Sequence, residues 1–92
     1  MSVYLWLDDD RPAPPGWVWC KTVPQAQRLL ATGRVTYASL DHDLGQPENG
    51  SDLVIWMVHT GHWPQYRPGI HSANPLGAMR MQLDIIGSGR YR

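Results

Sequence analysis

Three short segments rich in Asp and His hold the side chains of this 92-residue chain that could act together as a chemical site. They are Asp8-Asp9-Asp10-Arg11, Asp41-His42-Asp43 and His71-Ser72-Ala73-Asn74. Each segment follows a short apolar run of the kind that forms a β-strand. Carboxylates, imidazoles, a guanidinium and a hydroxyl are the groups that bind metal ions and phosphates and that transfer protons. We therefore expect the segments to meet in one polar site.

The carboxylates of Asp8, Asp9 and Asp41 are the candidate metal ligands. They would lie on adjacent strand ends and offer the hard oxygen donors that Mg²⁺ takes together with water and a substrate phosphate. Mg²⁺ or Mn²⁺ bound there would also relieve the repulsion between like charges. Arg11 is the alternative cation. Its planar fork either neutralises the aspartates or holds a carboxylate or phosphate of a ligand.

The histidines of the second and third segments are the candidate proton-transfer groups. His42 and His71 could face a common reacting atom, one as base and one as acid, because imidazole titrates near neutral pH. The alternative is that one of them only hydrogen-bonds the backbone. Asp41 is included in this catalytic group, as is Ser72, which could bind a phosphoryl oxygen or, as the weaker alternative, act as a nucleophile.

Three further polar residues are expected to support the site. Asn74 should cap the helix that starts at Pro75, whose first amides could hold an anion, so Asn74 is also a candidate substrate contact. Asp43 should orient His42, and Asp10 should support the acidic cluster from outside it.

Strands are predicted at residues 3–7, 17–21, 35–40 and near 69–70, where apolar, β-branched and aromatic residues precede turn residues. Residues 12–16 read Pro-Ala-Pro-Pro-Gly, which cannot be helical and must form a loop. Each of the three polar segments therefore directly follows a predicted strand. The second strand is the one that no such segment follows.

Three helices are predicted between and after these strands. Thr22 and Gln25 match a capping box at the start of the first helix. The second helix should be capped by Ser51 or Asp52, and the third by Asn74. The glycines expected to end the three helices are Gly33, Gly61 and Gly87. The apolar stripe of the third helix consists of Leu76, Met79, Leu83 and Ile86.

The order of these elements predicts an α/β fold. Alternating strands and helices imply parallel strands joined by right-handed crossovers, and ligands of such sheets bind beyond the carboxyl ends of the strands. All three polar segments lie at such ends. A chain of this length forms one core, so residues 1–92 are expected to be a single domain.

Composition argues against some classes of partner and location. The formal net charge is zero, which gives no overall case for a general nucleic-acid-binding or membrane-binding surface. Cys20 is the single cysteine, so no internal disulfide is expected and a cytoplasmic setting fits best. No apolar run approaches the roughly 20 residues that span a bilayer.

The polar residues resemble those of the response-regulator receiver domain. Receivers have an acidic pair after the first strand, an Asp after the central strand and a Ser or Thr after the next, which Asp8-Asp9, Asp41 and Ser72 match in order. Two features depart from receivers: the Pro-rich loop replaces the first helix, and the fifth strand with its Lys is absent.

A closer resemblance is to the cyclic-phosphate processing receiver domains. It rests on Leu-Trp-Leu-Asp-Asp-x-Arg-Pro at 5–12, Leu-Asp-His-Asp-Leu-Gly at 40–45 and His-Ser-Ala-Asn-Pro at 71–75. The resemblance covers nearly the whole chain. It implies a small three-layer, flavodoxin-like fold whose four-stranded parallel sheet has the order 2-1-3-4.

The same resemblance implies the function. The chain should bind and hydrolyse a cyclic phosphate, either a 2′,3′-cyclic RNA end or a cyclic nucleotide signal, by metal-assisted acid/base chemistry. The carboxylates would hold the ion, Arg11 and Ser72 would contact phosphoryl oxygens, and His42 and His71 would transfer protons.

Three other functions remain open from the sequence. A non-catalytic protein could sequester a nucleotide with the same Arg, Ser and aromatic residues. A phosphoacceptor module would use Asp41 as acceptor, although the receiver Lys is missing. An interaction domain would retain the acids without using them. Self-association through the edge strand around Ile70 or through the last helix is also expected.

Overall fold

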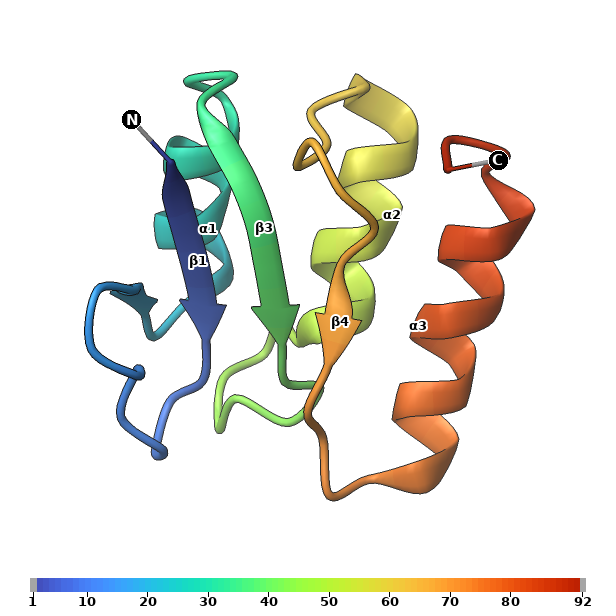
Figure 1. The fold of residues 1–92 in the computed structure, drawn as a ribbon. Coiled ribbons are helices and arrows are strands. Elements are labelled where there is room, and N and C mark those ends of the chain that lie inside the picture. The colour runs from blue at the N-terminus through green and yellow to red at the C-terminus, as the bar shows by residue number, and fades with distance from the viewer. Residues whose placement is uncertain (1, 92) are drawn as a thin grey trace.

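The computed structural model describes residues 2–91, which form a single parallel sheet and three helices (Figure 1). The sheet contains β1 (Val3–Leu7), β2 (Val18–Cys20), β3 (Val35–Leu40) and β4 (Gly69–Ile70), in the order β2-β1-β3-β4. The predicted α/β class and strand order are therefore confirmed. β2 is shorter than predicted, because Trp17 and Lys21 lie outside its ladder.

The helices are α1 (Val23–Leu30), α2 (Gly50–Thr60) and α3 (Pro75–Gly87). The predicted capping box of Thr22 and the Asn74 cap are confirmed. The predicted cap of α2 is wrong: Asn49 caps it, and Asp52 is the residue that bonds back to the Asn49 amide in a second capping box. Within residues 2–91 no helix combines the length and the apolar character needed to cross a lipid bilayer.

All three helices pack on one face of the sheet (Figure 1). The crossovers from β2 to β3 and from β3 to β4 step across the sheet in the same direction, and right-handed crossovers in one direction lie on the same face. The step from β1 to β2 runs the other way, but its connection is the Pro-rich loop. The second helical layer of the predicted three-layer arrangement is consequently missing from the described part of the chain.

Aromatic side chains cover the face of the sheet that has no helix. The register pairs Tyr4 with Tyr37 and Trp6 with Ser39, so these side chains point to the same face. Trp17, at the end of the Pro-rich loop, lies 5.3 Å from Tyr4, 6.0 Å from Trp6 and 5.7 Å from Tyr37 between ring centroids. The loop thus supplies a ring where a helix would otherwise pack.

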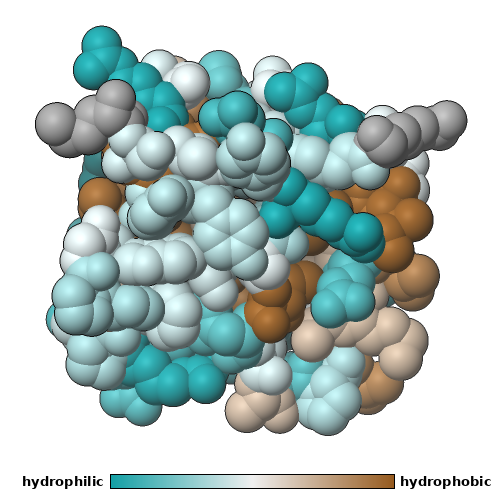
Figure 2. Space-filling model, viewed as in Figure 1, coloured by the Kyte–Doolittle hydropathy of each residue, from teal (hydrophilic) through white to brown (hydrophobic). Residues whose placement is uncertain are grey.

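The apolar stripe that the sequence indicates for α3 does not face the core. Its members are exposed: Leu76 78%, Met79 57%, Leu83 58% and Ile86 58%. The buried side of α3 instead carries Gly77, Met81 and Ile85. Gly77 sets this orientation because the ring of His42 lies where a Cβ at position 77 would be. Figure 2 shows apolar side chains gathered on the side of the molecule where α3 lies.

Gly50 offers a test of how tightly the helices pack on the strand ends. A Cβ at Gly50 would clash with the Asp41 carbonyl and lie 2.7 Å from Met81 Cε. We expect Gly50→Ala to lower the free energy of unfolding by about 1–3 kcal/mol or more, as overpacked sites do. Gly87→Ala is the matched control, since nothing lies within 4 Å and α3 should gain about 0.5–1 kcal/mol. Urea unfolding measures both, and equal effects would contradict this packing.

Candidate functional site

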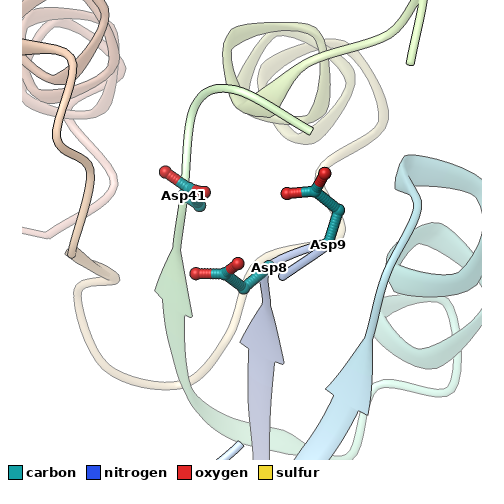
Figure 3. Close-up of side chains that lie close together, drawn as sticks. All are labelled: Asp8, Asp9 and Asp41. Carbon is teal, nitrogen blue, oxygen red and sulfur yellow. The ribbon is translucent and has the colours of Figure 1, made fainter. Parts of the chain in front are cut away.

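An acidic cluster lies at the carboxyl ends of β1 and β3, where Asp8, Asp9 and Asp41 turn toward one another (Figure 3). One carboxylate oxygen from each lies within 4.8 Å of the others. Asp8 and Asp41 are buried, with 1% and 6% of their surface exposed, whereas Asp9 is exposed. Three carboxylates at this spacing form a donor set that suits a hard divalent cation.

Asp8 is fully hydrogen-bonded within the protein. Its Oδ1 accepts the backbone N–H groups of Asp10 and Arg11, at 2.9 and 2.8 Å. Its Oδ2 accepts from Arg11 Nε and His71 Nε2, both at 3.0 Å. Burial acts to raise the pKa of Asp8, but these hydrogen bonds and the Arg11 charge outweigh it and hold the pKa below its usual value. These four hydrogen bonds use about as many lone-pair sites as a carboxylate has, so a cation bound at Asp8 would have to replace one of them.

Arg11 connects the acidic cluster to the third polar segment. Its Nη2 donates to the His71 carbonyl at 2.8 Å and lies 3.7 Å from Asp41 Oδ1. The sequence left open whether Arg11 neutralises the aspartates or binds a ligand. It does contact both buried carboxylates, and 51% of its side chain remains exposed to a ligand.

His71 lies between two buried polar groups and on an aromatic ring. Its Nδ1 is 2.7 Å from Ser39 Oγ, and its ring stacks on Trp6 at 3.8 Å between centroids. Since ionised Asp8 can only accept, His71 Nε2 carries the proton and Ser39 donates to Nδ1. Burial lowers the pKa of His71, and the hydrogen bond and charge of Asp8 oppose this only in part. His71 is therefore a neutral imidazole with both nitrogens occupied.

His42 lies on the helical side of the sheet, against α3. Its Nδ1 is 2.7 Å from Asp43 Oδ1, and the hydrogen bonds from His42 and Asn74 lower the pKa of Asp43. The contact with Asp43 orients the imidazole ring and uses Nδ1. The other ring nitrogen, Nε2, is the one that Asp43 does not contact. His71 lies on the opposite, aromatic face. Their predicted action on a common reacting atom stays a prediction.

The remaining predicted residues shape the loops around the cluster. Asn74 Oδ1 accepts from the Gly77 amide at 3.0 Å, and its Nδ2 donates to Asp43 at 3.2 Å. Ser72 Oγ accepts the Asn74 amide at 3.0 Å. Asp10 contributes its backbone amide to Asp8, while its side chain is exposed. Hydrogen bonds thus join all three polar segments.

Sequence reasoning missed two residues of this arrangement, Ser39 and Trp6. Ser39 is 9% exposed and lies between the buried residues Ala38 and Leu40, and a buried hydroxyl needs a hydrogen-bond partner. The hydrogen-bond requirement of a hydroxyl at this position was the signal in the sequence that could have pointed to Ser39. Trp6 gave none, because its stacking on His71 depends on how β1 and the residues after β4 meet.

Comparison with known proteins supports the family indicated by the motifs. A sequence profile described as the cyclic-phosphate processing Receiver domain matches residues 3–85, which include all three polar segments. No curated protein and no solved structure shows significant similarity to the chain.

The lowered pKa of His71 predicts an acid-sensitive fold. The unfolded chain binds a proton at His71 at higher pH than the folded chain does, so stability is lost as pH falls through about 6.5 toward the folded pKa. In chelator-containing buffer, the free energy of unfolding should fall between pH 7.5 and 5.5, and less so for His71→Gln. The control His59→Gln, at an exposed position, should keep the wild-type slope. Parallel slopes for wild type and His71→Gln would contradict the assignment.

Proposed function

Since the chain belongs to the cyclic-phosphate processing receiver domain family, we propose that its strand-end site binds and opens a cyclic phosphate ester. The substrate class is a 2′,3′-cyclic phosphate at an RNA end or a cyclic nucleotide. The observation that carries this proposal is the close approach of three carboxylates beside a half-exposed Arg11. A divalent cation and an anionic phosphate can be held side by side there.

The donor set suits a Mg²⁺ or Mn²⁺ ion. Asp9 and Asp41 would hold it directly, because an ion bound at Asp8 would have to replace one of its hydrogen bonds. Asp8 would act by fixing Arg11 and His71. When bound, the ion would supply positive charge next to the phosphoryl oxygens, which stabilises charge that develops during displacement at phosphorus.

The chain's own residues supply substrate contacts and proton transfer. Arg11 and Ser72 bind phosphoryl oxygens, and Arg11 does so with a planar group that fits two oxygens at once. A water oxygen forms a bond to phosphorus as one ribose P–O bond breaks. His42 Nε2 takes the proton of that water and returns it to the ribose oxygen, which leaves as a hydroxyl. His71 is a poor acid here, because its proton is committed to Asp8.

Binding without turnover is the second candidate function. It is favoured by the occupied nitrogens of His71, which leave His42 as the one imidazole of the polar segments with a ring nitrogen that no described residue uses. A protein of this kind would sequester a nucleotide and release it intact.

A nucleotide panel with Mg²⁺, Mn²⁺ or chelator tests the metal-assisted reaction. We expect wild type with metal to linearise at least one of the 2′,3′-cyclic or cyclic mono- and dinucleotides, scored by ³¹P NMR. Asp41→Asn should lower the rate by about 10²-fold or more, because it removes charge from the ion's ligands. Glu48→Gln, an exposed acid of the same loop, is the matched control. Activity that survives chelator would exclude the role of a metal.

Replacing His42 separates turnover from binding. His42→Gln should keep nucleotide affinity, measured by calorimetry, and lose about 10²–10⁴-fold in rate, which is the usual contribution of a general base. His59→Gln should leave both unchanged. If wild type binds a cyclic nucleotide tightly and returns it intact under every metal condition, hydrolysis is wrong and sequestration is correct.

A further inference from the structure

The exposed stripe of α3 has the spacing of a helix–helix contact. Leu76, Met79, Leu83 and Ile86 are separated by 3, 4 and 3 residues, which is the spacing of core positions in paired helices. This spacing reads the same in either direction, with its centre at Met81. Two copies packed antiparallel would therefore place Leu76 opposite Ile86 and Met79 opposite Leu83 of the second copy.

A groove beside the stripe extends the apolar surface onto α2. Cavities of about 470 and 440 Å³ lie between α2 and α3 and share Ile55, Arg80 and Asp84 among their lining residues, so they form one continuous groove. Ile55 and Val58 of α2 are each 46% exposed. An apolar surface that spans two adjacent helices and is flanked by charges is typical of a protein contact site.

The two charges in the groove favour a second copy of this chain as the occupant. Arg80 and Asp84 lie four positions apart on α3 and form no salt bridge with any residue in the 2–91 range. In the register set by the stripe, Arg80 of each copy lies opposite position 82 of the other, two residues and about 3 Å along the helix axis from Asp84, which its long side chain can reach. A two-fold interface requires this reciprocity, in which residue i meets j and j meets i.

We propose that α3 and the adjoining groove form the interface of an antiparallel homodimer. α3 has 13 residues and is about 20 Å long, so the contact area lies at the small end of specific interfaces. Dimerisation should therefore depend on concentration, with a dissociation constant on the order of micromolar. The carboxylates of the acidic cluster contribute nothing to this contact, whereas His42 and Asn74 of the polar segments line one end of the groove.

Sedimentation from micromolar to millimolar concentration tests the interface. Wild type should shift from monomer to dimer, and Leu83→Glu should weaken association by about 10²-fold or more, because it places a charge in the centre of the contact. Tyr66→Glu is the matched control, since Tyr66 is 59% exposed and lies outside α3 and the groove. It should dimerise as wild type does. Circular dichroism confirms that each variant is folded.

Reversing the two charges separately distinguishes pairing between copies from pairing within one helix. Arg80→Asp and Asp84→Arg each place like charges opposite one another in a homodimer, so each variant alone should be monomeric. An equimolar mixture should form a heterodimer, in which every Arg faces an Asp across the interface. Pairing within one helix would predict no rescue, because both chains carry like charges at positions 80 and 84.

Three results would overturn the proposal. They are a wild type that stays monomeric at millimolar concentration, a Leu83→Glu variant that dimerises as wild type does, and a charge-reversed mixture that remains monomeric. A wild type that stays monomeric would mean that a different protein covers this face of α3. None of these results depends on whether the acidic cluster binds or hydrolyses a cyclic phosphate.

Discussion

The buried carboxylate of Asp8 is the constraint on which the site depends. It ends the central strand β1, where a charge can be buried only if its oxygens are all hydrogen-bonded. Two backbone amides, Arg11 and His71 meet that requirement. By meeting it they fix the loop after β1, place the Arg11 guanidinium between the two buried carboxylates, and fix the proton of neutral His71 on Nε2. Asp9 and Asp41 are thereby left as the carboxylates with oxygens available for a ligand.

The placement of the helices on one face explains the rest of the architecture. Because both helical crossovers step in the same direction, no helix of residues 2–91 covers the opposite face, where Trp17 packs against other aromatic side chains. Aromatic rings suit this position since they bury a large apolar area while their N–H and O–H groups reach polar partners. Trp6 illustrates both roles: its ring stacks on His71, and its Nε1 donates to the Arg11 carbonyl.

His42 has a structural role in addition to its proposed role in proton transfer. His42 packs against Gly77 and thereby sets which side of α3 faces the core, and its Nδ1 is fixed by Asp43. The same contact turns the apolar stripe of α3 outward. The site and the proposed dimer face therefore meet at one imidazole, because His42, together with Asn74, also lines the groove beside α3.

The sequence by itself determined the strands, the strand order through the family resemblance, two of three helix caps, and the placement of the polar segments at strand ends. These features follow from local periodicity and capping chemistry, or from motifs contiguous in the chain. Tertiary structure alone decided which face of α3 is buried, which carboxylate is saturated and which nitrogen of His71 carries the proton. The physical reason is that their partners are distant in the chain: His71 bonds Ser39 and Asp8 across separations of 32 and 63 residues. No local pattern specifies such a pairing.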